Sequence, residues 1–288
     1  MRALRSLWLV LLLTLVLPFA APAAGAADLS FRTSDGVRLH LIESGPSQAP
    51  TIVFVPGWLM PAWIFQAQVA AFSRAYHVVA LDPRGQGESD IPSEGYNQLR
   101  RGQDIGDLIT ALGNRPVLLV AWSLGVLDSL AYVQQAGDAR LAGLVLIDNS
   151  VGEDPPPRPS GLPMRRGPRL EREVQMRRFV QGMFRSAPGA TYLARLTDDA
   201  LRTPPEIAAR LGNYGMPRSF WRDAVYSVHK PILYVVRPRF AGQAANLAAR
   251  HPTAETALFA EAGHALFVDE PARFNELLQD FISRRVWP

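Results

Sequence analysis

Residues 117–125 read Val-Leu-Leu-Val-Ala-Trp-Ser-Leu-Gly, and the chain continues Val126-Leu-Asp-Ser-Leu-Ala-Tyr132. An apolar, strand-like run therefore leads into Ser123 and then into a helical pattern, which is the setting of a nucleophile elbow. The turn is so tight that the residues two before and two after the serine must be small, and here they are Ala121 and Gly125. The usual pattern is Gly-x-Ser-x-Gly, from which Ala121 departs while keeping a small side chain. The stretch predicts that the Ser123 hydroxyl stands clear of a sheet at the start of a helix.

The first 26 residues are predicted to be a cleaved secretory signal. Arg2 and Arg5 give a positively charged start, and Leu7 to Leu17 is an apolar stretch of signal-peptide length. The small residues at 24–26 offer a cleavage site. The apolar stretch is too short to span a bilayer comfortably, so an uncleaved anchor is the weaker alternative. We therefore expect a mature protein that begins near Ala27, is periplasmic or secreted, and has no stable membrane insertion.

Composition bounds the remaining chain of about 260 residues, which suits one large domain. The apolar content of 48% is ample for a core, and the lack of cysteine excludes disulfides and lipid attachment through a thiol. Without the two arginines of the leader, the net charge falls from +4 to +2. No basic face with interleaved aromatic residues is apparent, so a nucleic-acid partner is not expected.

Strand-like and helix-like segments alternate along the chain. Two alternating apolar and polar segments flank Asp35-Gly36 and indicate a hairpin, Leu29–Thr33 and Val37–Glu43. Dense apolar runs are typical of strands buried on both faces: Thr51–Val55, His77–Leu81, Val117–Val120, Leu141–Ile147 and Pro231–Val236. Helical patterns cover Trp63–Phe72, Asn97–Leu112, Leu124–Gln135, Gly242–Arg250 and Pro271–Ile282. This order predicts an α/β fold with a mostly parallel, doubly wound sheet and an antiparallel hairpin at one edge.

Residues 152–228 break the alternation because they contain no strand-like run. They carry thirteen arginines against eight acidic residues, a net charge of +5, whereas the rest of the mature chain carries −3. We expect a helical cap inserted between two core segments, 27–151 and 229–288. It would cover the carboxyl edge of the sheet, where ligands bind in open α/β folds. The alternative is a solvated insertion whose charges have no functional pattern.

A serine is a weak nucleophile unless a neighbouring base removes its proton. Among the five histidines, His264 stands out because it follows Gly263 in a short segment between a strand-like Thr256–Ala260 and the final helix. Asp269 and Pro271 are expected to start that helix. We expect His264 to be the base, with a loop histidine of no special role as the alternative. No spacing of His, Asp and Glu indicates a metal site, and no cofactor is expected.

The base needs a carboxylate to orient it and to stabilise its cation. Asp148 directly follows the strand-like Leu141–Ile147, whereas the segment after Pro231–Val236 offers no carboxylate before Glu255. Asp148 is therefore our choice for the acid. The alternative is a turn carboxylate that binds the amides of residues 149 and 150.

Two backbone amides are expected to stabilise an oxyanion. Leu124 follows the serine at a helix N-terminus, where the helix dipole favours negative charge. The second amide is that of Trp58, in the Pro56-Gly57-Trp58 loop after a predicted strand. Aromatic walls are typical of small-molecule pockets. The insertion supplies apolar candidates at Phe179, Met183, Phe184, Tyr192, Phe220 and Trp221. Of these we expect Trp221 and Phe184, with Trp122, to line the substrate pocket.

From about Leu29 to the C-terminus, the chain resembles the α/β-hydrolase fold superfamily. The matching stretches are Phe54-Val-Pro-Gly-Trp58, Asp82-Pro-Arg-Gly-Gln-Gly-Glu-Ser89, Ala121-Trp-Ser-Leu-Gly125 and Gly263-His-Ala-Leu-Phe-Val-Asp-Glu-Pro271. The resemblance implies a serine–acid–histidine triad, a cap over the site and hydrolysis without a cofactor. Trp-Ser-Leu-Gly is also similar to carboxylesterases that act on methyl esters of dicarboxylate chains.

The chain departs from the family pattern at two places. Pro56 stands where the family usually has histidine, and proline removes an amide donor there. The usual acid after the seventh core strand is absent. Some members, including certain dehalogenases, place it after the sixth, which matches Asp148. A serine nucleophile argues against dehalogenation, which in this family uses an aspartate.

These residues together predict a secreted serine hydrolase that cleaves small-molecule carboxylic esters through an acyl-enzyme. Ser123 would attack, His264 would carry the proton and Asp148 would orient His264. The same triad would also serve a cofactor-free haloperoxidase or perhydrolase, a lactonase or a carbon–carbon bond hydrolase. A rival of another class is a catalytically silent binding protein on this scaffold.

The arginine surplus of the insertion suggests a feature of the substrate. One or two of Arg165, Arg166, Arg177 and Arg178 are expected to face the cleft and to bind a substrate carboxylate, since guanidinium binds carboxylate bidentately. The alternative is that all four are solvated and the substrate is neutral.

Overall fold

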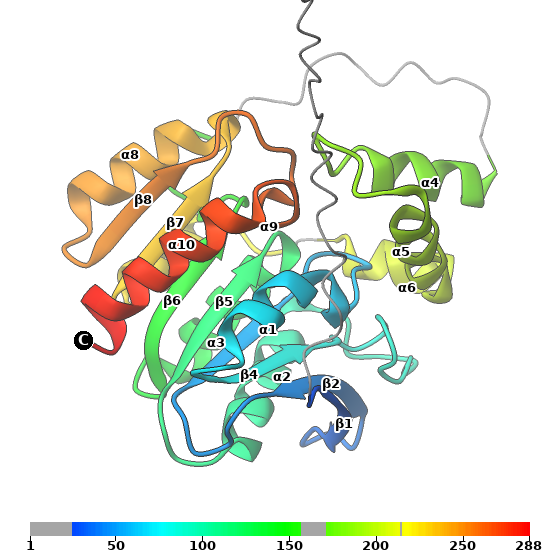
Figure 1. Cartoon of the computed structure of the whole chain (residues 1–288), viewed down its shortest axis with the longest axis horizontal. Helices are drawn as coiled ribbons and strands as arrows, with labels where there is room; N and C mark the ends of the chain where they lie inside the picture. The colour runs from blue at the N-terminus through cyan, green and yellow to red at the C-terminus, as the bar shows by residue number, and fades with distance from the viewer. Residues whose placement is uncertain (1–24, 157–170, 214) are drawn as a thin grey trace, which may run out of the picture.

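One eight-stranded sheet runs through the computed structural model, which describes residues 25–156, 171–213 and 215–288 (Figure 1). Its strands in chain order are β1 Ala27–Arg32, β2 Arg38–Ser44, β3 Thr51–Val55, β4 His77–Leu81, β5 Val117–Trp122, β6 Leu141–Ile147, β7 Ile232–Val236 and β8 Ala254–Leu258. In space the order is β1-β2-β4-β3-β5-β6-β7-β8. The strands from β4 to β8 pair in parallel, whereas β2 pairs antiparallel with both β1 and β4. The predicted α/β class and the edge hairpin are confirmed.

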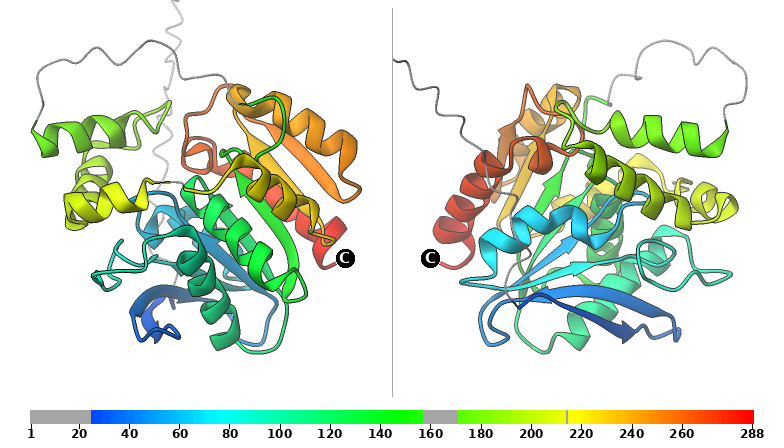
Figure 2. Two further views of the ribbon diagram at one scale, coloured as in Figure 1. Left: turned by 180° about the vertical axis from the view of Figure 1, so that it is seen from behind. Right: turned by 45° about the vertical axis from the view of Figure 1, so that its right-hand side comes forward.

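Helices cover both faces of this sheet (Figures 1 and 2). The short helix η1 Ala62–Phe65 packs on one face together with α1 Gln66–Phe72, α9 Leu266–Asp269 and α10 Pro271–Phe281. The other face carries α2 Gln98–Ala111, α3 Leu124–Ala136, α7 Arg218–Tyr226, the short η2 Pro238–Phe240 and α8 Ala241–Arg250. The chain ends in a π-helical turn, Ile282–Val286. The sheet is therefore doubly wound, as the alternation of segments predicts.

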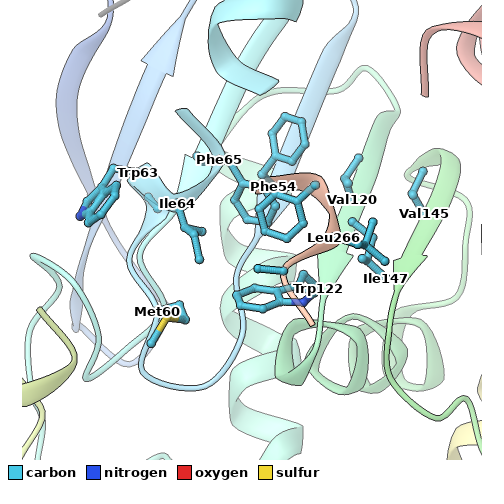
Figure 3. Close-up of a cluster of buried hydrophobic side chains, with 14 of the residues drawn as sticks. Phe54, Met60, Trp63, Ile64, Phe65, Val120, Trp122, Val145, Ile147 and Leu266 are labelled. Carbon is cyan, nitrogen blue, oxygen red and sulfur yellow. The ribbon is translucent and has the colours of Figure 1, made fainter. Parts of the chain in front are cut away.

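The two-residue period of a strand divides the core into two clusters. In β3, Ile52 and Phe54 belong to the cluster under α1 and α10, while Val53 and Val55 belong to the cluster under α2 and α3. Figure 3 shows part of the first cluster, in which the Phe54 and Phe65 rings lie 4.9 Å apart between their centroids. Because both faces are apolar and buried, the dense runs of the sequence form the strands that hold the site.

The helices inserted between β6 and β7 meet the loops at the carboxyl edge of the sheet. They begin with α4 Arg172–Gln181, α5 Ala190–Arg202 and α6 Pro205–Leu211. Trp58 Nε1, in the loop after β3, donates to the Ala208 carbonyl at 2.8 Å. Thr203 Oγ1 donates to the Gly85 carbonyl, in the loop after β4, at 2.6 Å. We refer to α4, α5 and α6 together as the cap (Figure 2).

The fourth inserted helix does not belong to this cap. On α7, Trp221, Ala224 and Val225 are buried in the same cluster as residues of α3. The segment that we expected to form a cap, 152–228, therefore includes a helix of the core layer. The net charge of the segment gave no sign of this difference, because it does not report which helix has an apolar face turned toward the sheet.

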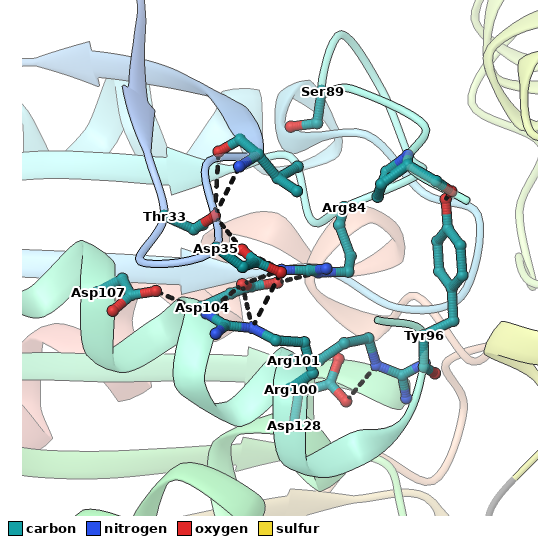
Figure 4. A network of polar contacts seen from close by, with 12 residues as sticks. Thr33, Asp35, Arg84, Ser89, Tyr96, Arg100, Arg101, Asp104, Asp107 and Asp128 are labelled. Carbon is teal, nitrogen blue, oxygen red and sulfur yellow. Dashed lines mark hydrogen bonds and ion pairs between the residues drawn. The ribbon is translucent and has the colours of Figure 1, made fainter. Parts of the chain in front are cut away.

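A buried ion-pair network fixes the loop after β4 (Figure 4). The Arg84 side chain is fully buried and donates to both Asp104 carboxylate oxygens, at 2.6 Å each. It also donates to Asp35 in the hairpin turn. Below it, Arg101 pairs with Asp128 at 2.8 Å. Removing one partner of such a buried pair typically costs about 3–5 kcal/mol, so this network holds the 82–89 loop firmly in place.

No helix within the described ranges is long and apolar enough to cross a membrane. The predicted signal sequence, residues 1–26, lies almost wholly outside those ranges.

Candidate active site

Ser123 occupies a sharp turn between β5 and α3. Its backbone angles, φ 54° and ψ −119°, lie in a region that non-glycine residues rarely adopt. Gly125 makes this turn possible, because a Cβ there would lie 2.5 Å from the Val55 carbonyl oxygen. Ala121, two residues before the serine, is fully buried. The strand–serine–helix setting predicted from the sequence is present, with the hydroxyl raised at the carboxyl edge of the sheet.

The structure brings together the three residues that the sequence suggested for a triad. His264 Nε2 lies 2.8 Å from Ser123 Oγ, and His264 Nδ1 lies 2.6 Å from Asp148 Oδ2. A carboxylate accepts, so Nδ1 carries the ring proton and Nε2 is left to accept the proton of the serine hydroxyl. This is the geometry in which a histidine can act as a general base toward a serine.

Asp148 is buried at the end of β6 and has a second partner, the cationic side chain of Arg237. Arg237, which follows β7, donates its backbone amide to Oδ1 at 3.0 Å and its Nε to Oδ2 at 2.6 Å. Burial alone would raise the pKa of the Asp148 carboxyl. The hydrogen bond from His264, the positive charge of Arg237 and the hydrogen bond from the Arg237 amide outweigh it and hold this pKa below its usual value. Asp148 is therefore held as a carboxylate, the form that can orient a histidine.

The alternative role of Asp148, as a turn carboxylate for the amides that follow it, does not agree with these contacts. The Ser150 amide donates instead to Asn149 Oδ1 at 2.8 Å. Asn149 Nδ2 donates to the Ser123 carbonyl at 2.8 Å, which ties the end of β6 to the serine turn. Our sequence reasoning missed Asn149. Its place beside the end of β5 would have been the signal, since β5 and β6 are neighbours.

The loop after β3 lies directly against Ser123. A Cβ on Gly57 would come within 2.9 Å of the Ser123 Cβ, so only glycine allows this approach. Gln86, from the loop after β4, accepts from the Leu59 amide at 2.8 Å and donates to the Gly57 carbonyl at 3.0 Å. Gln86 was also missed, although it lies within a stretch that the sequence singled out. It fixes the loop that carries Trp58.

The amides proposed for an oxyanion hole lie on the two segments beside the serine. Leu124 is the first residue of α3, and Trp58 follows the close approach of Gly57. Within the described residues neither backbone amide has a hydrogen-bond acceptor. Two unused donors beside a serine hydroxyl are what stabilisation of a tetrahedral oxyanion requires.

A clasp joins the His264 loop to the cap. Asp269 accepts from the amides of Gly263 at 2.6 Å, Arg185 at 2.8 Å and Ser186 at 3.2 Å. The Ala265 amide donates to the Met183 carbonyl at 2.9 Å. Our expectation that Asp269 starts the last helix is wrong, because three loop amides capture its carboxylate instead.

Pro271 does begin α10, as expected, and Glu270 stands at its N-cap. The strand before the His264 loop, β8, runs over Ala254–Leu258, slightly earlier than the predicted Thr256–Ala260.

A cavity of about 450 Å³ opens beside Ser123 and His264. Asp148, Asn149, Phe179, Met183 and Phe240 contribute to its lining. Three arginines do so as well, namely Arg178, Arg237 and Arg239. Aromatic and apolar walls with a few convergent polar groups are typical of small-molecule sites. Of the four arginines considered from the sequence, Arg178 lines this cavity, Arg177 pairs with Glu173, and Arg165 and Arg166 lie outside the described residues.

The three aromatic residues expected in the pocket lie elsewhere. Trp122 is buried in the core cluster of Figure 3, and its Nε1 donates to the His264 carbonyl at 2.9 Å. Trp221 is buried between α7 and α3. Phe184 packs edge-on against Tyr192, with ring centroids 6.0 Å apart. The place of Trp122 beside the serine and that of Trp221 and Phe184 in the insertion did not reveal which face each ring would occupy.

Another cavity, of about 470 Å³, lies at the edge hairpin away from the serine. Its histidine, His40, lies 2.8 Å from Asp82 Oδ2 and 3.2 Å from Asp28 Oδ1. The hydrogen bond to Asp82 raises the His40 pKa. No group of three His, Asp or Glu side chains in the described residues is placed to hold a metal ion.

Comparison with known proteins places the chain in a protein family. The model of the alpha/beta hydrolase family matches residues 52–277. A non-heme chloroperoxidase from Streptomyces lividans is 34% identical over 116 residues, which are 40% of this chain and 42% of that protein. A bifunctional esterase/perhydrolase from Acinetobacter calcoaceticus is 31% identical over 116 residues, again 40% and 42% of the two chains. The matched part thus spans about two-fifths of the length of these curated relatives.

Solved structures share the fold over most of the chain. An esterase, RhEst1, from Rhodococcus sp. ECU1013 is similar with a TM-score of 0.74 at 21% sequence identity, covering 90% of this chain and 99% of that one. Identity at this level is a likeness of fold.

Proposed function

The chain belongs to the alpha/beta hydrolase family, and from this premise we propose that it is a serine hydrolase that cleaves carboxylic esters of small molecules. The observation that carries the proposal is the continuous chain of contacts from Ser123 through His264 to Asp148, at 2.8 Å and 2.6 Å. It ends beside a cavity with aromatic walls. Each of the three side chains lies within hydrogen-bond distance of the partner that acyl transfer requires.

In the proposed first step, Ser123 Oγ attacks the ester carbonyl carbon while its proton passes to His264 Nε2. The carbonyl oxygen becomes an oxyanion and accepts hydrogen bonds from the amides of Trp58 and Leu124. Such preorganised donors are worth about 3–4 kcal/mol each in related sites. The tetrahedral species then collapses, the carbon–oxygen bond to the alcohol breaks, and His264 returns its proton to the departing alcohol.

In the second step, water attacks the acyl-enzyme and His264 again takes the proton. The acid leaves and Ser123 recovers its hydrogen, so the atoms and charges balance without a cofactor. Throughout, Asp148 accepts the hydrogen bond from His264 Nδ1, and it stabilises the cationic form of His264. The hydrogen bond from His264 and the contacts with Arg237 together favour the ionised form of Asp148.

A fluorophosphonate probe distinguishes this enzyme from a catalytically silent binding protein. The probe phosphonylates an activated serine, so peptide mapping should find the adduct on Ser123. Ser123→Ala should remove the labelling, and Ser129→Ala is the matched control. Ser129 lies on α3, the helix that follows Ser123, and its buried hydroxyl has no partner within the described residues. Equal labelling of wild type and Ser123→Ala would exclude the proposed nucleophile.

A perhydrolase is the second candidate, because one relative is a bifunctional esterase/perhydrolase and another is a non-heme chloroperoxidase. In that reaction hydrogen peroxide replaces water as the attacker of the acyl-enzyme, and a peracid leaves instead of an acid. Product analysis with and without peroxide separates the two. Parallel panels of lactones and diketones test lactonase and carbon–carbon bond hydrolase activity on the same triad.

We also propose that the protein is exported after cleavage near Ala27. The strand β1 begins at Ala27, so cleavage there would leave the edge hairpin whole. N-terminal sequencing of the exported form is the test. A chain that retains Met1 in the membrane fraction would indicate an uncleaved anchor instead.

A further inference from the structure

The cavity beside Ser123 carries an excess of positive charge. Arg178 from α4 and Arg237 and Arg239 from the segment after β7 line it, against one carboxylate, that of Asp148. Arg237 is already committed to that carboxylate at 2.6 Å. This pair is neutral as a unit, so the charge that faces the cavity comes from Arg178 and Arg239.

These two guanidinium groups have no acidic partner. Neither Arg178 nor Arg239 makes an ion pair or a side-chain hydrogen bond with any described residue. The undescribed segments 1–24 and 157–170 contain six arginines and no aspartate or glutamate. Every carboxylate side chain of residues 1–288 is therefore among the described residues, and none of them pairs with either arginine.

The neighbouring Arg177 shows that this arrangement is local. It is exposed on the same helix, pairs with Glu173 one turn earlier, and does not line the cavity. Arg239 in turn lies with its guanidinium 5.5 Å from the centre of the Phe240 ring, which supports the side chain at the wall. Two unpaired cations thus face one cavity that also holds the proposed nucleophile.

We infer that the ester substrate carries a carboxylate on its acyl chain, which Arg178 and Arg239 bind while Ser123 attacks the ester carbonyl. This inference rests on the proposed function and names its substrate class. Guanidinium matches a carboxylate bidentately. The apolar walls at Phe179, Met183 and Phe240 would contact the methylene chain between the two ends of the substrate.

The test compares two esters whose acyl chains have equal length, monoethyl adipate and ethyl hexanoate. Because Arg178 and Arg239 are exposed, each should contribute only about threefold, so kcat/KM should favour monoethyl adipate by about tenfold at low salt. The preference should shrink toward unity when salt is raised to about 0.5 M, since screening weakens exposed ion pairs. It should lie mainly in KM, because the carboxylate is bound alike in the ground state and the transition state.

Variants locate the effect. Arg178→Gln and Arg239→Gln should each lower the ratio of the two kcat/KM values about threefold. Arg177→Gln removes the same charge from the same helix outside the cavity and should leave the ratio unchanged. A ratio near one at low salt, or a preference that survives both cavity substitutions, would overturn the inference.

Failure of the inference and failure of the proposed function give different results. If Ser123→Ala hydrolyses both esters as fast as wild type, the proposed function fails and the inference falls with it. If hydrolysis depends on Ser123 but shows no preference, only the inference fails. If neither ester is turned over, labelling of Ser123 by the fluorophosphonate probe tests binding alone. Hexanoate anion should slow the labelling, whereas hexanol should not. Arg178→Gln should weaken the protection by hexanoate. Equal effects of hexanoate and hexanol would contradict carboxylate binding.

Discussion

Arg237 donates its Nε hydrogen to Asp148 Oδ2 at 2.6 Å, the same carboxylate oxygen that lies 2.6 Å from His264. The contact arises because β6 and β7 are parallel neighbours, so the residues after their carboxyl ends meet. Arg237 thus stands after β7, where the family usually places its acid, and it contacts Asp148 at the end of the neighbouring strand β6.

We expect Arg237→Gln to lower both stability and activity. Asp148 would lose one charge-assisted hydrogen bond while remaining buried, which should cost about 1–3 kcal/mol of unfolding free energy. The carboxylate would also hold His264 less firmly, so kcat should fall by roughly tenfold, the change that about 1.4 kcal/mol produces. Chemical denaturation and ester kinetics measure the two effects. The exposed Arg74 makes no side-chain hydrogen bond or ion pair among the described residues, so Arg74→Gln is the control. Equal behaviour of the two variants would contradict the role given to Arg237.

Asp148→Asn should lower kcat by about 10³–10⁴ without unfolding the protein, because an amide would favour the wrong tautomer of His264. Circular dichroism and ester kinetics check both parts of this expectation. Glu255→Gln is the control, since Glu255 pairs with Arg284 at the surface, away from the serine. A large loss in Glu255→Gln with none in Asp148→Asn would reverse the assignment of the acid.

Asp269→Ala should release the clasp between the His264 loop and the cap. Three amides would lose their acceptor, which we expect to cost about 1–3 kcal/mol and to lower kcat through misplacement of His264. Asp269→Asn keeps one acceptor oxygen and should recover part of the loss. Thermal unfolding and kcat measure the series. Wild-type kinetics in Asp269→Ala would show that the clasp does not position the histidine.

The lowered pKa of Asp148 predicts how its contribution to stability depends on pH. The usual value of 3.8 applies to the unfolded chain, so near and below that pH the unfolded state binds more protons than the folded state. The stabilisation is therefore fully present above about pH 5 and is lost as pH falls through the folded-state pKa. The difference in unfolding free energy between wild type and Asp148→Asn should shrink between about pH 5 and pH 3. A difference that stays constant over this range would contradict the pairing.

The sequence was sufficient for the sheet because its strands are short apolar runs buried on both faces. Thr51–Val55, His77–Leu81 and Leu141–Ile147 begin and end where we predicted. The three residues proposed as a triad also lie together, since the elbow, the end of β6 and the loop after β8 all face the carboxyl edge. These contacts follow from strand order, which the alternation of segments largely determines.

The sequence could not predict in which direction each side chain would point. Trp122 precedes the serine, but its side chain alternates toward the core face of β5 and packs there with Phe267 at 5.2 Å between ring centroids. Asp269 has the composition of a helix start, yet loop amides from the distant cap compete for it more strongly. Arg237 could have been noticed, because a cation after β7 lies beside Asp148 once the strands are known to be neighbours.

Turnover by Ser123→Ala tests the central claim most directly. With p-nitrophenyl acetate as substrate, we expect the variant to lose at least about 10⁴ in kcat relative to wild type, as removal of a triad member does elsewhere. Ser129→Ala, on the helix that follows Ser123, should keep wild-type turnover. If purified and folded Ser123→Ala hydrolyses the ester at the wild-type rate, Ser123 is not the nucleophile and the proposed mechanism is wrong.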